Sequence, residues 1–203
     1  MYDLFDPLIH VIDPFIIPES FEKICSIDFG YTNPFVCQFW AISPDNEWFL
    51  YREIYHSHRL VEDHAVEIKK WVDKEKIKYV FVDHDAEDKA TLESRGIRSD
   101  NAEKSISPGI QETYSKFRTS DSEKSKIYFF RNAVVEKDQY LAQQKKPLST
   151  VEEIQQYVWN NKNEKDIPIK KNDHGCDAMR YAIYSYSKMN EKESGAKYGV
   201  ITW

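Results

Sequence analysis

The chain has 203 residues and a formal net charge of −6, with 14% aromatic residues, 6 glycines and 8 prolines. This composition excludes a disordered or fibrous protein and is typical of one folded domain. No apolar run approaches the roughly 18 to 20 residues that cross a bilayer, and the first residues lack the pattern of a signal peptide, so we expect a cytoplasmic protein without a membrane anchor.

The three cysteines, Cys25, Cys37 and Cys176, are an odd number and have no Cys-x-x-Cys spacing. Neither a disulfide framework nor a zinc site is indicated by that pattern. We expect all three to be reduced and mostly buried.

Residues 1–22 carry three prolines among apolar residues, which favours an extended segment packed on the core over a helix. We interpret this segment as an N-terminal arm or linker remnant. The domain proper is expected over residues 23–189, and residues 190–203 are polar and predict a loose C-terminal tail.

Three strands joined by short turns are predicted at residues 23–28, 35–42 and 48–55, and together they would form an antiparallel meander. Farther on, apolar spacing and turn residues predict alternating helices and short buried strands. The expected helices are at 60–72, 85–95, 149–159 and 173–188, with weaker helical patterns around 110–117 and up to 144, and the expected strands are at 77–82 and 126–130. The order predicts an α/β domain.

Two of the predicted strands end in an aspartate. Asp28 is followed by Gly30, which permits a tight turn, and Asp83 follows the buried strand. If these strands are neighbours in one sheet, the two carboxylates lie side by side at one edge. Asp85 is a second choice for the same position, because it comes only two residues later. An aspartate at a strand end also commonly just bonds the turn amides.

A third group of polar residues begins the last predicted helix. His174 and Asp177 are three residues apart, so on a helix they project from one face and can address one site, while Asp173 fits the N-cap. Taken alone, such a pair is more often a surface contact than a pair of metal ligands. The two strand-end acids shift that balance.

Three carboxylates in one pocket repel one another, and a bound cation makes such a cluster tolerable at neutral pH. Oxygen ligands with at most one imidazole favour Mg²⁺ or Mn²⁺ over zinc or copper. Two such ions about 4 Å apart activate water and stabilise the leaving oxygen of a phosphodiester. The acids therefore predict metal-dependent hydrolysis of a nucleic-acid backbone.

With this order of elements the chain resembles the ribonuclease H-like superfamily: a mixed sheet of three antiparallel meander strands followed by parallel strands, with helices on both faces. Within it, residues 8–186 resemble the C-terminal nuclease domain of the large terminase subunit of tailed bacteriophages. The motifs that carry this resemblance are IDFG at 27–30, YRE at 51–53, VDHDAED at 82–88 and, most specifically, NDHGCDAMRYA at 172–182.

The resemblance implies a DNA endonuclease that cuts concatemeric viral DNA during genome packaging, with two Mg²⁺ or Mn²⁺ ions. Carried over by position, Asp28 and Asp177 would be core metal ligands. Asp83, or alternatively Asp85, would be the ligand after the middle strand, and His174 an accessory ligand or a group near the attacking water.

The implied partners are double-stranded DNA, an upstream terminase ATPase domain, the portal and the small terminase subunit. The implied location is the host cytoplasm, at the procapsid portal. The chain has no Gly-x-x-x-x-Gly-Lys-Ser/Thr loop. Either the chain is a domain excised from a longer one, or the ATPase motor is on another chain; we expect the first, with Met1 an artificial start.

Two rival functions remain. The segment 28–32 also resembles the first phosphate loop of the actin and sugar-kinase group, although six glycines leave little for the other loops of a phosphotransferase. A catalytically silent domain that binds DNA or a portal is the second rival. The net negative charge fits poorly with DNA binding, but basic residues gather locally, where a DNA path is one interpretation; they are Lys124, Lys126, Lys145, Lys146, Lys170 and Lys171. Taken alone, each such cluster is more often a solvated surface than a phosphate site.

Overall fold

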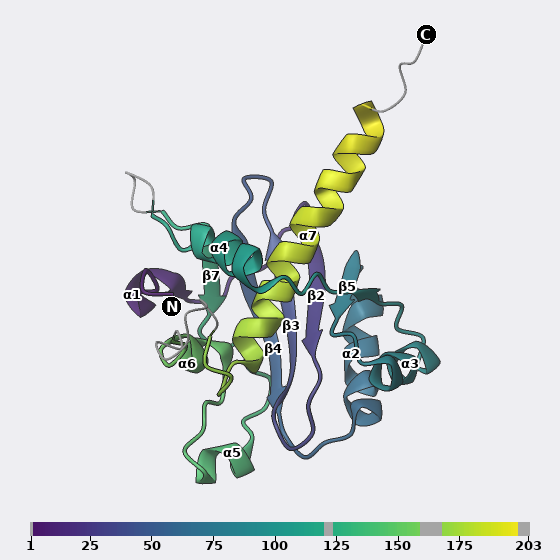
Figure 1. The fold of residues 1–203 in the computed structure, drawn as a ribbon, viewed down its shortest axis with the longest axis vertical. Coiled ribbons are helices and arrows are strands. Elements are labelled where there is room, and N and C mark those ends of the chain that lie inside the picture. The colour runs from purple at the N-terminus through teal and green to yellow at the C-terminus, as the bar shows by residue number, and fades with distance from the viewer. Residues whose placement is uncertain (1, 120–123, 159–167, 199–203) are drawn as a thin grey trace.

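The computed structural model describes residues 2–119, 124–158 and 168–198, with residues 194–198 given by their backbone alone. Its strands are β1 (Val11–Ile12), β2 (Glu22–Asp28), β3 (Phe35–Ile42), β4 (Trp48–His56), β5 (Tyr79–Val82), β6 (Asp100–Asn101) and β7 (Ile127–Phe130). Within the described residues they form one mixed sheet in the order β1-β7-β4-β3-β2-β5-β6 (Figure 1).

The predicted meander is confirmed, because β2 pairs antiparallel with β3, and β3 with β4. Parallel strands flank it on both sides: β5 lies beside β2, and β7 lies beside β4. In the parallel pair, Ile27 of β2 is level with Val82 of β5. The carboxyl ends of these two strands therefore meet at one edge of the sheet.

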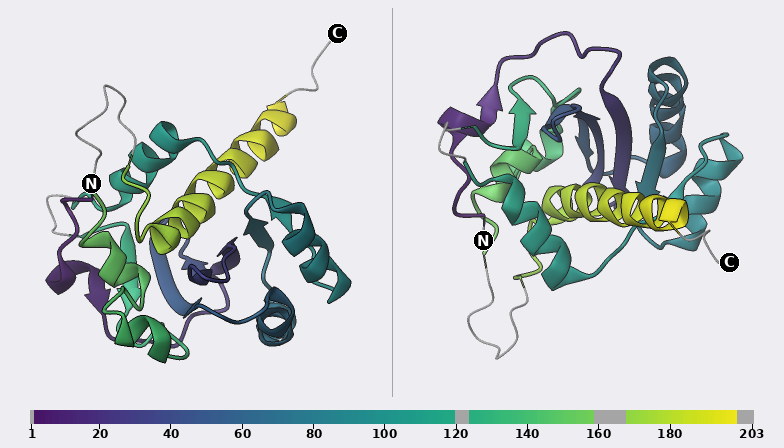
Figure 2. Two further views of the ribbon diagram at one scale, coloured as in Figure 1. Left: turned by 60° about the horizontal axis from the view of Figure 1, so that its bottom comes forward. Right: turned by 90° about the horizontal axis from the view of Figure 1, so that it is seen from above.

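Helices cover both faces of the sheet, as the resemblance implied (Figure 2). They are α1 (Pro7–His10), α2 (Val61–Glu75), α3 (Ala86–Ser94), α4 (Ile106–Lys116), α5 (Gln139–Gln143), α6 (Thr150–Ile154) and α7 (His174–Tyr198). In the part of the chain that is described, none of them is both long and apolar enough to cross a membrane.

Alternation of side chains along the strands builds two apolar cores, one on each face. Trp40 and Ile24 pack with Met179 of α7 on one face, and α4 packs against α7 there. Cys25 and Phe39 point to the other face, where α2 and α3 lie. The strand β2 is thus covered on both sides, which explains why Ile24, Cys25 and Ile27 are completely buried.

The N-terminal arm is more ordered than the sequence predicted. Asp6 caps α1 by accepting a hydrogen bond from the Leu8 N–H at 2.8 Å, with Pro7 at the first helical position. The arm then adds β1 to the sheet, parallel to β7. Apolar residues and prolines did indicate packing on the core, but pairing with a strand more than a hundred residues away has no local sequence signal.

Two helix ends also differ from the expected ones. The helix predicted over residues 149–159 ends at Ile154, and Trp159 lies outside the described residues. The last helix continues to Tyr198 instead of ending at Lys188. Its polar residues include several good helix formers, which extend a helix without needing a buried face.

Asp138 is the buried N-cap of α5, and its carboxylate fastens that helix to the end of β4. It accepts hydrogen bonds from the Tyr140 and Leu141 N–H groups, and from the Ser57 N–H and hydroxyl at 2.7 Å. Burial raises the pKa of Asp138, but the bonds from Ser57 and the α5 amides outweigh it and hold the pKa below its ordinary value.

We expect Asp138→Ala to lower the free energy of unfolding by about 2 to 3 kcal/mol at pH 7. Because the folded-state pKa is depressed, this contribution is present above the unfolded pKa of about 3.9 and is lost as the pH falls through and below it. Urea unfolding between pH 3 and pH 7 measures the effect. Asp85→Ala, at an exposed N-cap, is the control and should cost only about 1 kcal/mol; equal losses for both variants would contradict this account.

Candidate metal centre

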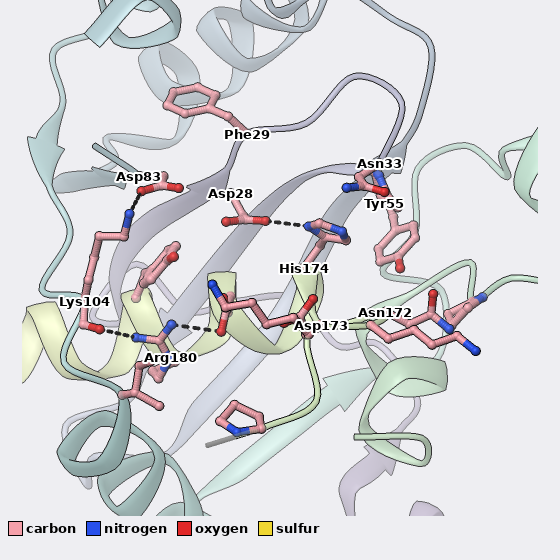
Figure 3. A pocket seen from close by; sticks show the side chains of 18 of the residues that line it. Asp28, Phe29, Asn33, Tyr55, Asp83, Lys104, Asn172, Asp173, His174 and Arg180 are labelled. Carbon is pink, nitrogen blue, oxygen red and sulfur yellow. Dashed lines mark hydrogen bonds and ion pairs between the residues drawn. The ribbon is translucent and has the colours of Figure 1, made fainter. Parts of the chain in front are cut away.

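A pocket of about 580 Å³ opens at the edge where β2 and β5 end (Figure 3). Asp28, Asp83, His174 and Asp177 all line it, together with the cations Lys104 and Arg180. The structure therefore brings together the residues that the sequence singled out on two strands and one helix. Their positions have separate local causes.

Asp28 and Asp83 are neighbours because of strand register. Asp28 is the last residue of β2, and the Asp83 N–H donates to the Ile27 carbonyl at 3.1 Å, which continues the parallel ladder by one residue. Side chains alternate along a strand, so both carboxylates point to the face that α7 covers. The acids of two strands are thereby presented to one helix.

Asp85 has a different place. It is the N-cap of α3, where its carboxylate accepts hydrogen bonds of 3.0 Å from the N–H groups of Glu87 and Asp88. The pocket lined by Asp28 and Asp177 does not include Asp85 among its described lining residues. Of the two alternatives, the geometry favours Asp83.

The first turn of α7 supplies the rest of the cluster. His174 Nδ1 donates to Asp28 Oδ2 at 2.9 Å, and Asp177 lies one turn farther along the same helix face. Asp173 directly precedes α7, and its carbonyl accepts the Asp177 N–H at 2.7 Å. Histidine and aspartate at this spacing therefore do address one pocket.

Burial is the main reason that the pKa of Asp28 is raised to about 6. The hydrogen bond from His174 opposes this rise, whereas the negative charges of Asp177 and Asp83 add to it. Burial lowers the pKa of His174, but its bond to Asp28 outweighs that effect and raises it above the ordinary value. Asp177 and Asp83 are thus close enough to disfavour the ionisation of Asp28.

Two basic side chains neutralise the other two acids. Lys104 Nζ forms an ion pair with Asp83, and Arg180 Nη2 donates to Asp177 Oδ1 at 2.8 Å. With the side chains held in these pairs, no three acids, histidines or cysteines of the described residues are grouped closely enough to ligate one ion. The acids face one pocket from three elements, and two of them, Asp83 and Asp177, each pair with a cation.

The donor set nevertheless fits a divalent cation. Three carboxylates and one imidazole are hard ligands of the kind that Mg²⁺ and Mn²⁺ take. Asp28 is only 6% exposed. Within the described residues, the His174 imidazole is the one hydrogen-bond partner of its carboxylate. A cation among these acids would offset both its burial and the repulsion from Asp83 and Asp177.

A buried polar network fixes the start of α7. Gln38 Nε2, from β3, donates to the Gly175 carbonyl at 2.8 Å and to Thr150 Oγ1 at 2.7 Å. Glu153 accepts from the Cys176 N–H at 3.0 Å and from the Tyr55 hydroxyl at 2.5 Å. Sheet, α6 and α7 are joined at the turn that carries His174 and Asp177.

The network contains two buried carboxyl groups to which the sequence reasoning assigned no role, although Glu53 belongs to the YRE motif at 51–53. Burial raises the pKa of Glu53 to about 8 and that of Glu153 to about 7, against the hydrogen bonds that each accepts. Gly175 belongs here because a Cβ would lie within 2.9 Å of the Thr150 Cα and the Glu153 carboxylate. Only a glycine allows α7 to approach α6 this closely.

Sequence reasoning also missed Lys104 and Arg180. Arg180 had a usable signal, since it follows Asp177 by three residues and so lies over the same helix face. Lys104 had none, because it lies in the connection between the short strand β6 and α4.

Of the basic residues suggested as a DNA path, Lys146, Lys170 and Lys171 line the pocket, whereas Lys126 bonds the Asp45 carbonyl at 3.2 Å.

Comparison with known proteins finds similarity to phage large terminases. Over 93% of its length the chain is 25% identical to the terminase large subunit of Escherichia phage T5, of which it spans 42%. The large terminase of the thermophilic bacteriophage D6E superposes with a TM-score of 0.72 over 91% of this chain and 44% of its own, at 24% identity. The nuclease domain of the P22 large terminase superposes with a TM-score of 0.68, over 91% of this chain and 90% of that domain, at 20% identity.

No protein-family model matches the chain. The fold is nevertheless that of a ribonuclease H-like α/β domain, with a pocket lined by aspartates at the carboxyl ends of its central strands. Its sequence similarity to the T5 terminase large subunit, together with the fold that it shares with the P22 nuclease domain, supports a terminase large-subunit nuclease domain. It spans less than half the length of the T5 and D6E subunits.

The raised pKa of Asp28 has a consequence for stability without metal. A folded-state pKa above the unfolded value means that stability falls as the pH rises from about 4 to about 6. Asp28→Asn, which cannot ionise, should therefore be more stable than the wild type by about 1 to 3 kcal/mol at pH 7.5 in EDTA. Urea unfolding should show this difference disappearing near pH 4; a variant less stable than the wild type at pH 7.5 would contradict it.

Proposed function

We propose that this domain is a divalent-metal-dependent endonuclease that hydrolyses phosphodiester bonds of double-stranded DNA during viral genome packaging. The observation that carries the proposal is the convergence of Asp28, Asp83 and Asp177, from three separate elements, on one pocket of a fold shared with a terminase nuclease domain. Acids placed this way serve no packing purpose, since each needs a cation or a hydrogen-bond donor to offset its burial.

In this proposal Asp28, Asp83 and Asp177 hold two Mg²⁺ or Mn²⁺ ions, with His174 as an accessory ligand or as a base beside the attacking water. The metals would supply an activated water and stabilise the leaving oxygen. The chain's own contribution is position: the β2–β5 register sets Asp28 beside Asp83, and the buried network sets the first turn of α7.

Similarity to terminase large subunits supports the packaging role. Because the chain spans only part of those subunits, the remaining functions of the whole protein belong to the proposal. They are cleavage of concatemeric DNA, work in the host cytoplasm at the procapsid portal, and partnership with an ATPase domain, the portal and the small terminase subunit.

The same similarity favours a nuclease over a phosphotransferase that would use the segment 28–32. A catalytically silent DNA- or portal-binding domain differs from the nuclease in one measurable respect. Both would bind a partner, but only the nuclease would break a phosphodiester bond when metal is added.

We expect the wild-type protein to nick supercoiled plasmid in Mn²⁺ or Mg²⁺ and to be inactive in EDTA. Asp28→Asn should lower the nicking rate at least about a hundredfold, because a ligand to the charge-stabilising centre is lost. Circular dichroism establishes that the variant is folded. A pure wild-type protein that nicks in neither metal would sink the proposal in favour of the silent binding domain.

The choice between the two neighbouring acids can be tested directly. Asp83→Asn should abolish nicking, whereas Asp85→Asn should leave its rate within about twofold, because asparagine caps a helix as well as aspartate does. Agarose-gel kinetics on both variants measures this. Loss of activity in Asp85→Asn with activity kept in Asp83→Asn would reverse the assignment.

A further inference from the structure

The two cations that pair with acids of the pocket, Lys104 and Arg180, differ in how firmly they are held. The Arg180 side chain is 4% exposed, packs 4.8 Å over the Tyr181 ring and donates from both terminal nitrogens, to Asp177 and to the Lys104 carbonyl. The Lys104 side chain is 39% exposed, and among the described residues its ammonium group pairs with Asp83 alone. The Arg180 guanidinium is thus held at several points, whereas the Lys104 ammonium is held at one.

The main chain around Lys104 is anchored so that its side chain stays at the pocket. The Ala102 N–H donates to the Val82 carbonyl at 2.8 Å, and the Glu103 N–H donates to Ser185 Oγ at 2.9 Å. The Lys104 carbonyl itself accepts from Arg180 at 3.1 Å. Three successive residues are therefore tied to β5 and α7, and Lys104 lines the pocket beside Asp83 (Figure 3).

We propose that Lys104 is an exchangeable cation of the site: it occupies Asp83 when no metal is bound, and metal binding at Asp83 releases its ammonium group to a DNA phosphate beside the bond that is cut. Lysine suits this role because its ammonium is a compact charge on a flexible stem, with three donors. Lys104 would then neutralise Asp83 when no metal is bound and bind a DNA phosphate when metal is bound. This inference rests on the proposed nuclease function.

The exchange makes metal binding and DNA binding depend on Lys104 in opposite directions. Without DNA, the metal has to displace the ammonium group from Asp83. With metal bound, the same group adds one phosphate contact. A lysine with a merely structural role would produce neither the gain in metal affinity nor a phosphate contact that needs metal.

Lys104→Met tests the exchange, with Lys78→Met as its matched control. Lys78 is also 39% exposed at its side chain and pairs with a carboxylate, Glu22, at 2.6 Å, but it lies at the opposite end of β5. Calorimetric titration with Mn²⁺ alone should show about two- to fivefold tighter binding for Lys104→Met, the range that a partly exposed ion pair accounts for. Lys78→Met should bind Mn²⁺ like the wild type.

DNA binding is then measured on a short duplex at several salt concentrations, in Ca²⁺ and in EDTA. For Lys104→Met the salt slope in Ca²⁺ should be less steep by about one unit, and unchanged in EDTA. An equal change in both buffers, or metal and DNA affinities equal to those of Lys78→Met, would overturn the exchange. Plasmid nicking by the wild type reports on the nuclease function separately, so the failure of either proposal can be recognised.

Discussion

The site depends on the way the first turn of α7 is seated against the sheet. Gln38 bonds the Gly175 carbonyl, Glu153 bonds the Cys176 amide, and the missing Cβ of Gly175 leaves room for α6. These bonds are buried, so a broken one leaves an unpaired polar group whose desolvation is not offset. The position of His174 and Asp177 relative to the strand-end acids follows from this one joint.

The acids themselves work against folding. Asp28 is buried beside two other carboxylates, which raises its pKa to about 6, and among the described residues His174 alone offsets that charge by a hydrogen bond. A structure carries such a cluster when function needs it, and Lys104 and Arg180 reduce its cost in the absence of metal. Lys104 and Arg180 therefore stabilise the fold and also lie in the pocket where the chemistry is proposed.

Much of this arrangement could be predicted from local pattern. The strands that end in Asp28 and Asp83 are short, apolar and bounded by turn residues, and the helical spacing of His174 and Asp177 is visible in the sequence. The β1–β7 pairing, the position of Lys104 and the buried pair of Glu53 and Glu153 could not be predicted. Each arises from contacts between segments distant in sequence, and glutamate inside a strand or short helix ordinarily indicates a solvent-facing position.

The central claim is that these acids are metal ligands, and a crystal grown with Mn²⁺ tests it most directly. Anomalous scattering should locate manganese between Asp28, Asp83 and Asp177, with the Lys104 ammonium no longer on Asp83. A crystal saturated with Mn²⁺ whose pocket holds no anomalous peak, with Asp83 still paired to Lys104, would contradict the account.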